Sequence, residues 1–145
     1  MKYSIMEERD IERVIDIYLD YYNEKEDCTW THDSAYKRIH QVWSTEDSFS
    51  LVLTEDNTIV GFAMGYFVQY DDIIAYDLIE IVIATMYQHK GLGTLMMLEL
   101  ERRIKERGAS LIQITAVNDD LHEQFYNKLD YQTAKNLILK SKWIE

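Results

Sequence analysis

The stretch Ile79–Met97, IEIVIATMYQHKGLGTLMM, decides the fold. It begins as an apolar strand, passes through a short loop with two glycines, and continues as a helix. Glycines in such a loop let the backbone turn tightly and bring its N–H groups onto a ligand. The helix N-terminus adds partial positive charge, so the combination predicts a site for phosphate or pyrophosphate. The alternative is an ordinary strand-to-helix turn that needs two glycines.

Two nucleotide-binding motifs do not fit this stretch. A P-loop needs Gly-x-x-x-x-Gly-Lys-Ser/Thr, and that pattern is absent. A dinucleotide fingerprint needs a third small residue where Met96 stands, and an acidic residue about 20 positions further on. The segment Ser110–Thr115 offers no acid. Both nucleotide sites are therefore excluded.

Hydrophobic patterns on both sides of this stretch predict strands and helices. Strands are expected at Lys2–Met6, Phe49–Leu53, Ile59–Gln69, Ile73–Ala84, Leu111–Val117 and Gln132–Leu139. Helices are expected from Asp10 to Tyr22, from about Asp33 to Trp43, over Gly91–Arg107, and from a cap at Asn118–Asp120 to about Leu129. This β-α-α-β-β-β-α-β-α-β order predicts one α/β (α+β mixed) domain over residues 1–145, with a mixed sheet.

Finer expectations concern the helices. Asp10 is expected to cap the first helix, and Gly108 is expected to end the helix that begins at Gly91. Leu95 and Leu98 are expected to face the core from that helix. Tyrosines of the first helix, Tyr18, Tyr21 and Tyr22, are expected to belong to the core and its rim rather than to a binding site.

Composition limits the function classes. The chain has 145 residues, 47% of them hydrophobic and 28% charged, which fits one globular domain and argues against disorder. Fifteen Lys and Arg stand against 26 Asp and Glu, giving a net charge of −11. Such an acidic chain repels nucleic acid, so no nucleic-acid partner is expected. A cationic or amine-bearing partner is favoured.

Other features also exclude whole classes. Cys28 is the single cysteine, so no internal disulfide forms, and no Cys-x-x-Cys pair indicates a metal site. The N-terminus shows no signal-peptide pattern. No apolar run approaches the roughly 20 residues that span a bilayer, so no membrane association is expected. The sequence predicts a cytoplasmic protein without a metal.

Two carboxylates interrupt the apolar strand Ile73–Ala84. Strict alternation places Glu80 on one face, between Leu78 and Val82, and Asp77 on the opposite face. An unpaired buried carboxylate is costly, so its presence here suggests a use. Glu80 is the first candidate for a general base and Asp77 the second. The alternatives for Glu80 are an ion pair with a nearby cation or exposure at a splayed strand.

Two motifs resemble those of the GNAT superfamily, the acyl-CoA-dependent N-acetyltransferases. Gln88–Gly93 is similar to that family's Gln/Arg-x-x-Gly-x-Gly/Ala signature, behind an apolar strand and ahead of a helix. Asn118, followed by Phe125–Tyr131, resembles the family's Phe-Tyr-x-Lys-Leu-Gly-Phe segment. The sequence departs from the family where Thr85 replaces the usual proline and Asp130 replaces a glycine. The order of elements fits over essentially the whole chain.

The resemblance implies a mostly antiparallel mixed sheet with helices on both faces, and acetyl-CoA as acyl donor. The pantetheine arm would pair with the strand edge, and the pyrophosphate would sit on backbone N–H groups of the loop. Asn118 either contacts the cofactor or caps the following helix, and Tyr126 would donate a hydrogen bond to the departing thiolate. The residues implied to bind acetyl-CoA are Ile81, Val82, Ile83, Gln88, His89, Lys90, Gly91, Leu92, Gly93, Thr94, Asn118 and Tyr126.

The predicted function is N-acetyl transfer to a primary amine by direct attack in a ternary complex, with Glu80 and Tyr126 as catalytic residues. No Cys or Ser is suitably placed to form an acyl-enzyme. Alternatives are an acyl-CoA-binding sensor or scaffold without turnover, a plain interaction domain, and acetylation of a protein lysine or N-terminus. A polyamine or aminoglycoside is the favoured acceptor, and a homodimer is a family-level expectation. The acids expected near the acceptor are Glu24, Glu26, Asp27, Asp33, Asp71 and Asp72.

Overall fold

The computed structural model describes residues 1–145 as two compact units, 1–115 and 116–145, and each is described by itself. The strands are β1 (Lys2–Ile5), β2 (Ser48–Glu55), β3 (Thr58–Gln69), β4 (Ile74–Ile83) and β5 (Leu111–Ile114). The helices are α1 (Asp10–Leu19), the π-helical turn η1 (Asp20–Lys25), α2 (His32–Trp43), the 3₁₀ turn η2 (Thr85–Tyr87), α3 (Leu92–Glu106) and α4 (Asp120–Lys128). No helix combines the length and the apolar character that crossing a bilayer requires.

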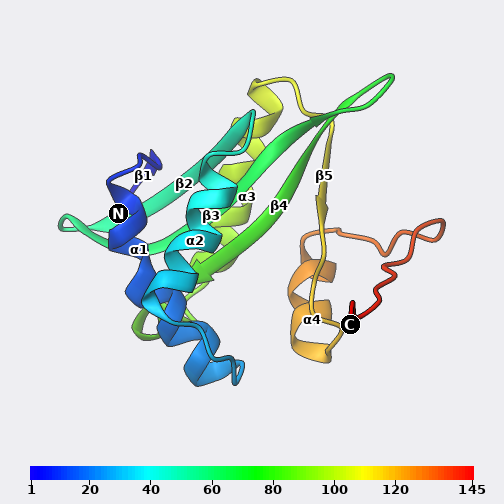
Figure 1. The fold of residues 1–145 in the computed structure, drawn as a ribbon. Helices are drawn as coiled ribbons and strands as arrows, with labels where there is room; N and C mark the ends of the chain where they lie inside the picture. The colour runs from blue at the N-terminus through cyan, green and yellow to red at the C-terminus, as the bar shows by residue number, and fades with distance from the viewer. The chain divides into compact units, whose positions relative to one another are not determined.

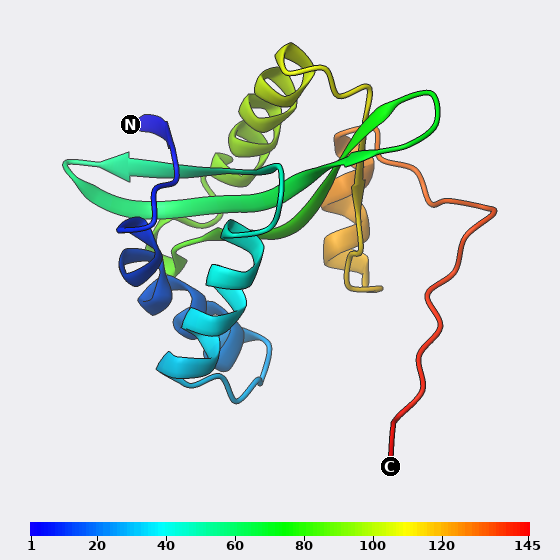
Figure 2. The same ribbon diagram turned by 45° about the horizontal axis from the view of Figure 1, so that its top comes forward.

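The first unit is built on one five-stranded sheet in the order β1-β2-β3-β4-β5. Neighbouring strands are antiparallel except for β4 and β5, which run parallel. Helices α1 and α2 cover one face of this sheet and α3 covers the other, as Figures 1 and 2 show. The expected mixed, mostly antiparallel sheet with helices on both faces is confirmed.

Apolar side chains fill both sides of the sheet. The helices α1 and α2 bury Ile11, Ile15 and Ile39 against Phe62 and Met64 of β3. On the other face, a Cβ at Gly61 would lie 3.3 Å from the methyl group of Met96, so the missing side chain lets α3 approach β3. The methionine pair of α3 is buried, and burial at about 25 cal/mol per Å² makes such packing the main stabilising force.

A β-bulge in β4 changes which side chains share a face. Met64 pairs with Glu80 while Gly65 pairs with Leu78, so Ile79 is an extra residue in β4. Tyr66, two residues from Met64, pairs with Asp77. Asp77 and Glu80 therefore lie on the same face of the sheet. The expectation of opposite faces was wrong because it assumed an uninterrupted alternation.

Several expected details of the helices differ in the structure. Arg9 holds the cap position of α1, and Asp10 is its first helical residue, where its carboxylate accepts a hydrogen bond from the Glu7 N–H. Leu95 and Leu98 are about half exposed, because the core-facing stripe of α3 runs through Met96, Met97, Leu100 and Ile104. Gly108 ends α3 with φ of +103°, as expected.

The second unit contains α4 and the chain that follows it. Asp119 caps α4 by accepting a hydrogen bond from the His122 N–H at 2.8 Å, so the cap role expected for Asn118 belongs to its neighbour. Asp130 adopts φ of +66°, a left-handed conformation that aspartate tolerates.

The final strand expected at Gln132–Leu139 does not form, and β5 ends at Ile114 rather than at Val117. Only the last three residues of the expected strand are strongly apolar, and all three are more than 60% exposed. A segment with so little alternation has no apolar face that a sheet could bury.

Candidate active site

Glu80 is the centre of a buried polar cluster. Its side chain is 6% exposed, and three elements on the same face supply donors to it. The Tyr18 hydroxyl of α1 donates to Oε1 at 3.3 Å, and the Tyr22 hydroxyl of η1 donates to Oε2 at 2.5 Å. Arg38 Nε of α2 donates to Oε1 at 3.2 Å and forms an ion pair. The alternative of a paired glutamate, left open by the sequence, is the arrangement found.

Burial and the Glu80 carboxylate keep both tyrosine hydroxyls protonated. Burial is the larger cause and raises the pKa of Tyr18 and of Tyr22 well above the ordinary value of a phenol. The neighbouring negative charge of Glu80 raises both pKa values further. Both hydroxyls therefore remain donors to Glu80 at every pH at which the protein would be assayed.

Three members of this cluster were not predicted from the sequence. Tyr18 is a core residue, as expected, but it also contacts Glu80, and so does Tyr22. Their spacing of four residues was a usable signal, since it places two hydroxyls on one helical face. Arg38 lies 42 residues from Glu80, and no local pattern points to it.

A tryptophan and an asparagine hold the tyrosines in place. The Trp30 ring meets the Tyr18 ring edge-on, with 5.1 Å between the ring centroids. The centroids of the Tyr18 and Tyr22 rings are 4.6 Å apart. Asn23 Nδ2 donates to the Trp30 carbonyl at 2.8 Å, and Asn23 Oδ1 accepts from the Trp30 N–H at 2.9 Å. The segment that joins η1 to α2 is thereby fixed beside the tyrosines.

The strand that carries Glu80 also has a free edge. β5 pairs with β4 only as far as Leu78, so the following residues of β4 have no strand beyond them. The Ala84 N–H donates to Val60 of β3, and Val82 pairs with Phe62 two positions earlier. Backbone groups alternate in an antiparallel ladder, so Val82 faces β3 while Ile81 and Ile83 face the free edge.

The loop after β4 caps this edge and leads to the N-terminus of α3. Gln88 Nε2 donates to the Ile83 carbonyl at 2.9 Å, which leaves the Ile83 N–H and both backbone groups of Ile81 at the edge. His89 and Gly91 have φ of +62° and +80°, and both turn the chain into α3. Lys90 Nζ lies 5.5 Å from the centre of the Tyr87 ring.

The first turn of α3 carries backbone donors with no acceptor inside the helix. Leu95 is the first residue whose N–H finds a helical acceptor, the Gly91 carbonyl at 3.1 Å, and no side chain caps the turn. The N–H groups of Leu92, Gly93 and Thr94 are therefore available, and the helix dipole favours an anion there. These three residues are among those expected from the sequence to hold the pyrophosphate, and that role stays a prediction.

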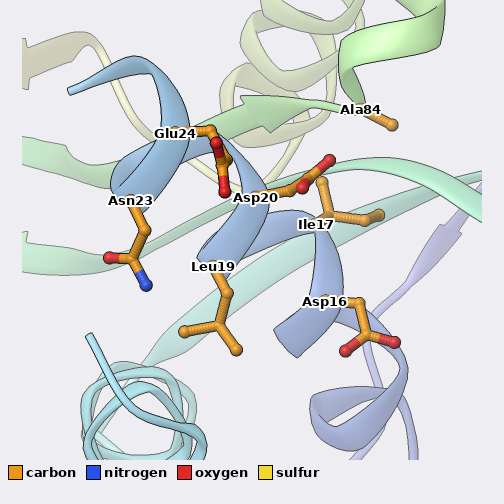
Figure 3. Close-up of a pocket in the computed structure, with 7 residues that line it drawn as sticks. All are labelled: Asp16, Ile17, Leu19, Asp20, Asn23, Glu24 and Ala84. Atoms are coloured by element: carbon orange, nitrogen blue, oxygen red, sulfur yellow. The ribbon is translucent and has the colours of Figure 1, made fainter. Parts of the chain in front are cut away.

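An open acidic cavity of about 490 Å³ lies between the α1–η1 segment and the end of β4. Figure 3 shows the residues that line it, among them Ala84, which directly follows β4. Asp16, Asp20 and Glu24 stand four residues apart along the helical segment and give the wall three carboxylates. Of the acids expected near the acceptor, Glu24 lines this cavity. No group of three His, Cys, Asp or Glu side chains is arranged to hold a metal ion.

Asp77 differs from Glu80 in having an unsatisfied oxygen. Its Oδ1 is buried and has no hydrogen-bond partner. Burial alone raises the pKa of the Asp77 carboxyl above its ordinary value. The side chain is partly exposed, so its other oxygen reaches solvent more easily than either oxygen of Glu80 does.

Two of the predicted site residues belong to the second unit. Tyr126 lies on α4, where its ring meets Phe125 at 5.0 Å and Tyr131 at 5.5 Å between centroids. Asn118 is exposed just before the helix cap. Their roles toward acetyl-CoA stay predictions.

Solved structures share this fold at low sequence identity. A possible acetyltransferase from Clostridium difficile 630 matches with a TM-score of 0.84 at 12% identity, covering 99% of this chain and 98% of that one. An aminoglycoside acetyltransferase from an uncultured soil metagenomic sample, in complex with sisomicin, matches with a TM-score of 0.76 at 15% identity. The match covers 99% of this chain and 96% of that one. A ribosomal-protein-alanine N-acetyltransferase from Brucella melitensis biovar Abortus 2308 matches with a TM-score of 0.77 at 14% identity. The match covers 99% of this chain and 100% of that one.

A search of curated proteins finds no match. The model of the acetyltransferase (GNAT) family, however, matches residues 11–131. That match includes β4, the loop after it, α3 and α4, and it spans well over half of the sequence. The chain therefore belongs to the GNAT acetyltransferase family.

Proposed function

We propose that the protein transfers an acetyl group from acetyl-CoA to a primary amine of a cationic small molecule. The observation that carries this proposal is the position of Glu80. A buried, hydrogen-bonded carboxylate stands on a strand that also offers a free backbone edge and leads into a helix N-terminus. Amide formation from a thioester needs a base and N–H donors to the carbonyl oxygen, and β4 would supply both. The N-terminus of α3, which follows β4, would hold the anionic part of the donor.

The donor site rests on backbone groups rather than on side chains. The N–H of Ile81 and that of Ile83 face the free edge of β4, where an extended amide chain such as pantetheine can pair with them. The N–H groups of Leu92, Gly93 and Thr94 would accept the pyrophosphate. His89 and Lys90 are exposed basic residues beside that turn and would help to hold the phosphate charge.

The acceptor side rests on the acidic cavity. Asp16, Asp20 and Glu24 place three carboxylates along one wall of the cavity, and a polyamine carries several charged nitrogens along one chain that could pair with them. The structural neighbour with sisomicin acts on an aminoglycoside, which is also a polycation. A polyamine or an aminoglycoside is therefore the proposed acceptor class.

The chain's own residues would act in three places. Glu80 would take the proton from the acceptor nitrogen, directly or through water. The outward N–H groups of β4 would hold the carbonyl oxygen as it gains negative charge. Tyr126 would donate a hydrogen bond to the sulfur as the thiolate leaves. No covalent acyl-enzyme is proposed, so the amine itself attacks.

Other expectations from the sequence stay open to test. Acetylation of a protein amine is an alternative, and the neighbour named for ribosomal-protein alanine acts on such a substrate. A sensor or scaffold that binds acetyl-CoA without turnover is a further one. A homodimer remains a family-level expectation, and the cytoplasm remains the location expected from the sequence.

A turnover assay tests the proposal. Acetyl-CoA should raise the melting temperature in a thermal-shift screen, and free thiol should then be released with spermidine, spermine or kanamycin. A peptide with an internal lysine and a peptide with an N-terminal alanine complete the panel. Thiol release with a peptide alone would move the substrate class to proteins. Stabilisation by acetyl-CoA without thiol release would favour the sensor. The absence of both stabilisation and thiol release would refute the proposed function.

A further inference from the structure

The three donors to Glu80 differ in how firmly they are held. Tyr18 is fully buried and Tyr22 is packed against it, and both come from the continuous α1–η1 segment. Arg38 comes from α2, and 41% of its side chain is exposed. It reaches the carboxylate through Nε alone, at 3.2 Å, rather than through two parallel N–H groups. Arg38 is thus the one charged and solvent-accessible member of the cluster.

The charge balance of the cluster leaves room for one cation. A carboxylate that is 6% exposed needs a positive partner, because an unpaired buried charge is strongly unfavourable. A protonated amine that reaches Glu80 brings a second cation to the same oxygen atoms, and two cations there repel each other. Arg38 has 41% of its side chain exposed, so its guanidinium can return to water, and the arriving ammonium then supplies the positive charge that the buried carboxylate needs.

We propose that Arg38 is a displaceable counter-ion of Glu80, whose place the ammonium group of the acceptor takes. The inference rests on the proposed function and extends it, because it makes acceptor selection an exchange of one cation for another. The tyrosine hydroxyls keep the carboxylate in place during the exchange. Neutral acceptors cannot compensate for the loss of Arg38, so the exchange selects cationic amines. Arg38 is a positioning residue in this scheme and does not touch the reacting atoms.

Kinetics separate this role from a permanent one. In Arg38→Met the acceptor no longer competes with a guanidinium, so KM for the best amine of the panel should fall about threefold to tenfold. The kcat value and KM for acetyl-CoA should stay within twofold. A drop in kcat with an unchanged KM for the amine would mean that Arg38 holds Glu80 throughout the reaction, and unchanged constants would mean an idle surface pair. Either result overturns the proposal.

Two further variants serve as controls. Arg9 forms an ion pair with Glu7 in which both side chains are more than 60% exposed, so Arg9→Met removes an arginine from a surface pair away from Glu80 and should change neither constant. Arg38→Lys keeps a cation on α2 and should restore KM for the amine toward the wild-type value. A KM in Arg38→Lys as low as in Arg38→Met would contradict competition between cations.

A measurement on the wild-type protein covers the case in which Arg38→Met does not fold. The Arg38 Nε–H resonance is followed by NMR while spermidine is added without acetyl-CoA, against NaCl at matched ionic strength. Displacement predicts that this resonance shifts and exchanges with solvent faster as spermidine saturates, while that of Arg9 does not change. An Arg38 signal that spermidine leaves unaltered overturns the proposal. If no amine of the panel is turned over, the proposed function fails. The NMR experiment still shows whether a cationic amine displaces Arg38 from Glu80.

Discussion

Glu80 shows how a buried charge can be kept ready for chemistry at the scale of one residue. Its two oxygens receive three donors, so the loss of hydration is offset by hydrogen bonds and one ion pair. A partner removed with nothing in its place leaves a buried charge unsatisfied. The position of Glu80 therefore depends on the tyrosines of α1 and η1, and its charge balance depends on a cation, either Arg38 or the acceptor.

Replacing Glu80 by glutamine tests the base. The amide keeps the shape of the side chain but cannot take a proton, so Glu80→Gln should lower kcat/KM by about 10²- to 10⁴-fold. The dissociation constant of acetyl-CoA should stay within about twofold. Steady-state thiol release over a range of pH provides the measurement, and the loss of rate on the acidic side of the profile should disappear.

The matched control is Asp77→Asn, because Asp77 lies on the same face but has no bond to the cluster. If the acidic side of the profile vanishes in Asp77→Asn and survives in Glu80→Gln, Asp77 is the base. If neither variant alters the profile, the amine loses its proton in solution before it binds.

Asp77 should limit the stability of the protein at neutral pH. Its carboxyl has a raised pKa in the folded protein, so the folded state binds a proton more tightly than the unfolded state does. The stability linked to this group is fully present below the ordinary pKa of aspartate and is lost as pH rises through the folded value. Asp77→Asn should therefore raise the free energy of unfolding at pH 7, where the wild-type carboxyl is ionised.

Urea unfolding at pH 7 and near pH 3 measures this difference. The gain in Asp77→Asn should shrink toward zero at the lower pH, where the wild-type carboxyl is protonated too. A variant that is less stable than the wild type at pH 7 would show that the ionised carboxylate has a stabilising role.

Tyr126 is expected to act on the leaving group. A phenol that donates to sulfur stabilises the thiolate, and the interaction strengthens only as the carbon–sulfur bond breaks. Tyr126→Phe should thus reduce kcat with little change in the affinity for acetyl-CoA. Calorimetric titration together with turnover provides the check, and an unchanged kcat with weakened binding would make Tyr126 a packing residue.

The entrance to α3 is where the chemistry depends on a whole element. Gly91 has φ of +80° and an open position around its missing Cβ, so a valine there is strained by the backbone rather than by a clash. Relief of this strain would turn the first N–H groups of α3 away from their common direction. Gly91→Val should weaken acetyl-CoA binding at least tenfold, as measured by calorimetry.

Gly108 provides a matched control at the other end of the same helix. It also has positive φ, and the nearest atom to its missing Cβ is 3.8 Å away. Gly108→Val should lose stability by a similar amount and keep its affinity for acetyl-CoA. Equal losses of affinity in the two variants would attribute the effect to general destabilisation.

Local patterns predicted most elements but not their irregularities. The strand-loop-helix order around Gln88–Gly93 follows from alternation, glycine positions and a helical stripe. Such patterns do not predict the extra residue Ile79 or the π-helical turn Asp20–Lys25. Each of them arises where tertiary packing overrides a regular period. The exposed Gln132–Leu139 segment was predicted as a strand from a short apolar run that has no partner.

For the molecule as a whole, long-range contacts determine the site. The sequence indicates that Glu80 is unusual, but its partners Arg38 and Tyr18 lie 42 and 62 residues away along the chain. Their identity depends on how α1 and α2 cross the sheet. The net charge of −11 is the one property of the acceptor side that composition alone provides.

This charge predicts a salt dependence. Screening shortens the reach of charge attraction to about 10 Å at 0.1 M salt, so KM for spermidine should rise about threefold to tenfold between 20 and 200 mM NaCl. Replacing the two aspartates of the cavity wall, in Asp16→Asn/Asp20→Asn, should flatten this dependence. A KM for spermidine that is independent of salt would exclude the acidic cavity as the acceptor site.

The contact between Trp30 and Tyr18 also gives the site an optical reporter. Excited tyrosines pass their energy to an indole at such short range, so Tyr18 and Tyr22 should both feed the emission of Trp30. The chain has three tryptophans, and changing Trp43 and Trp143 to phenylalanine would leave Trp30 as the single emitter. Any movement of the hydroxyls around Glu80 would then appear as a change in fluorescence intensity or colour, with no label attached to the protein.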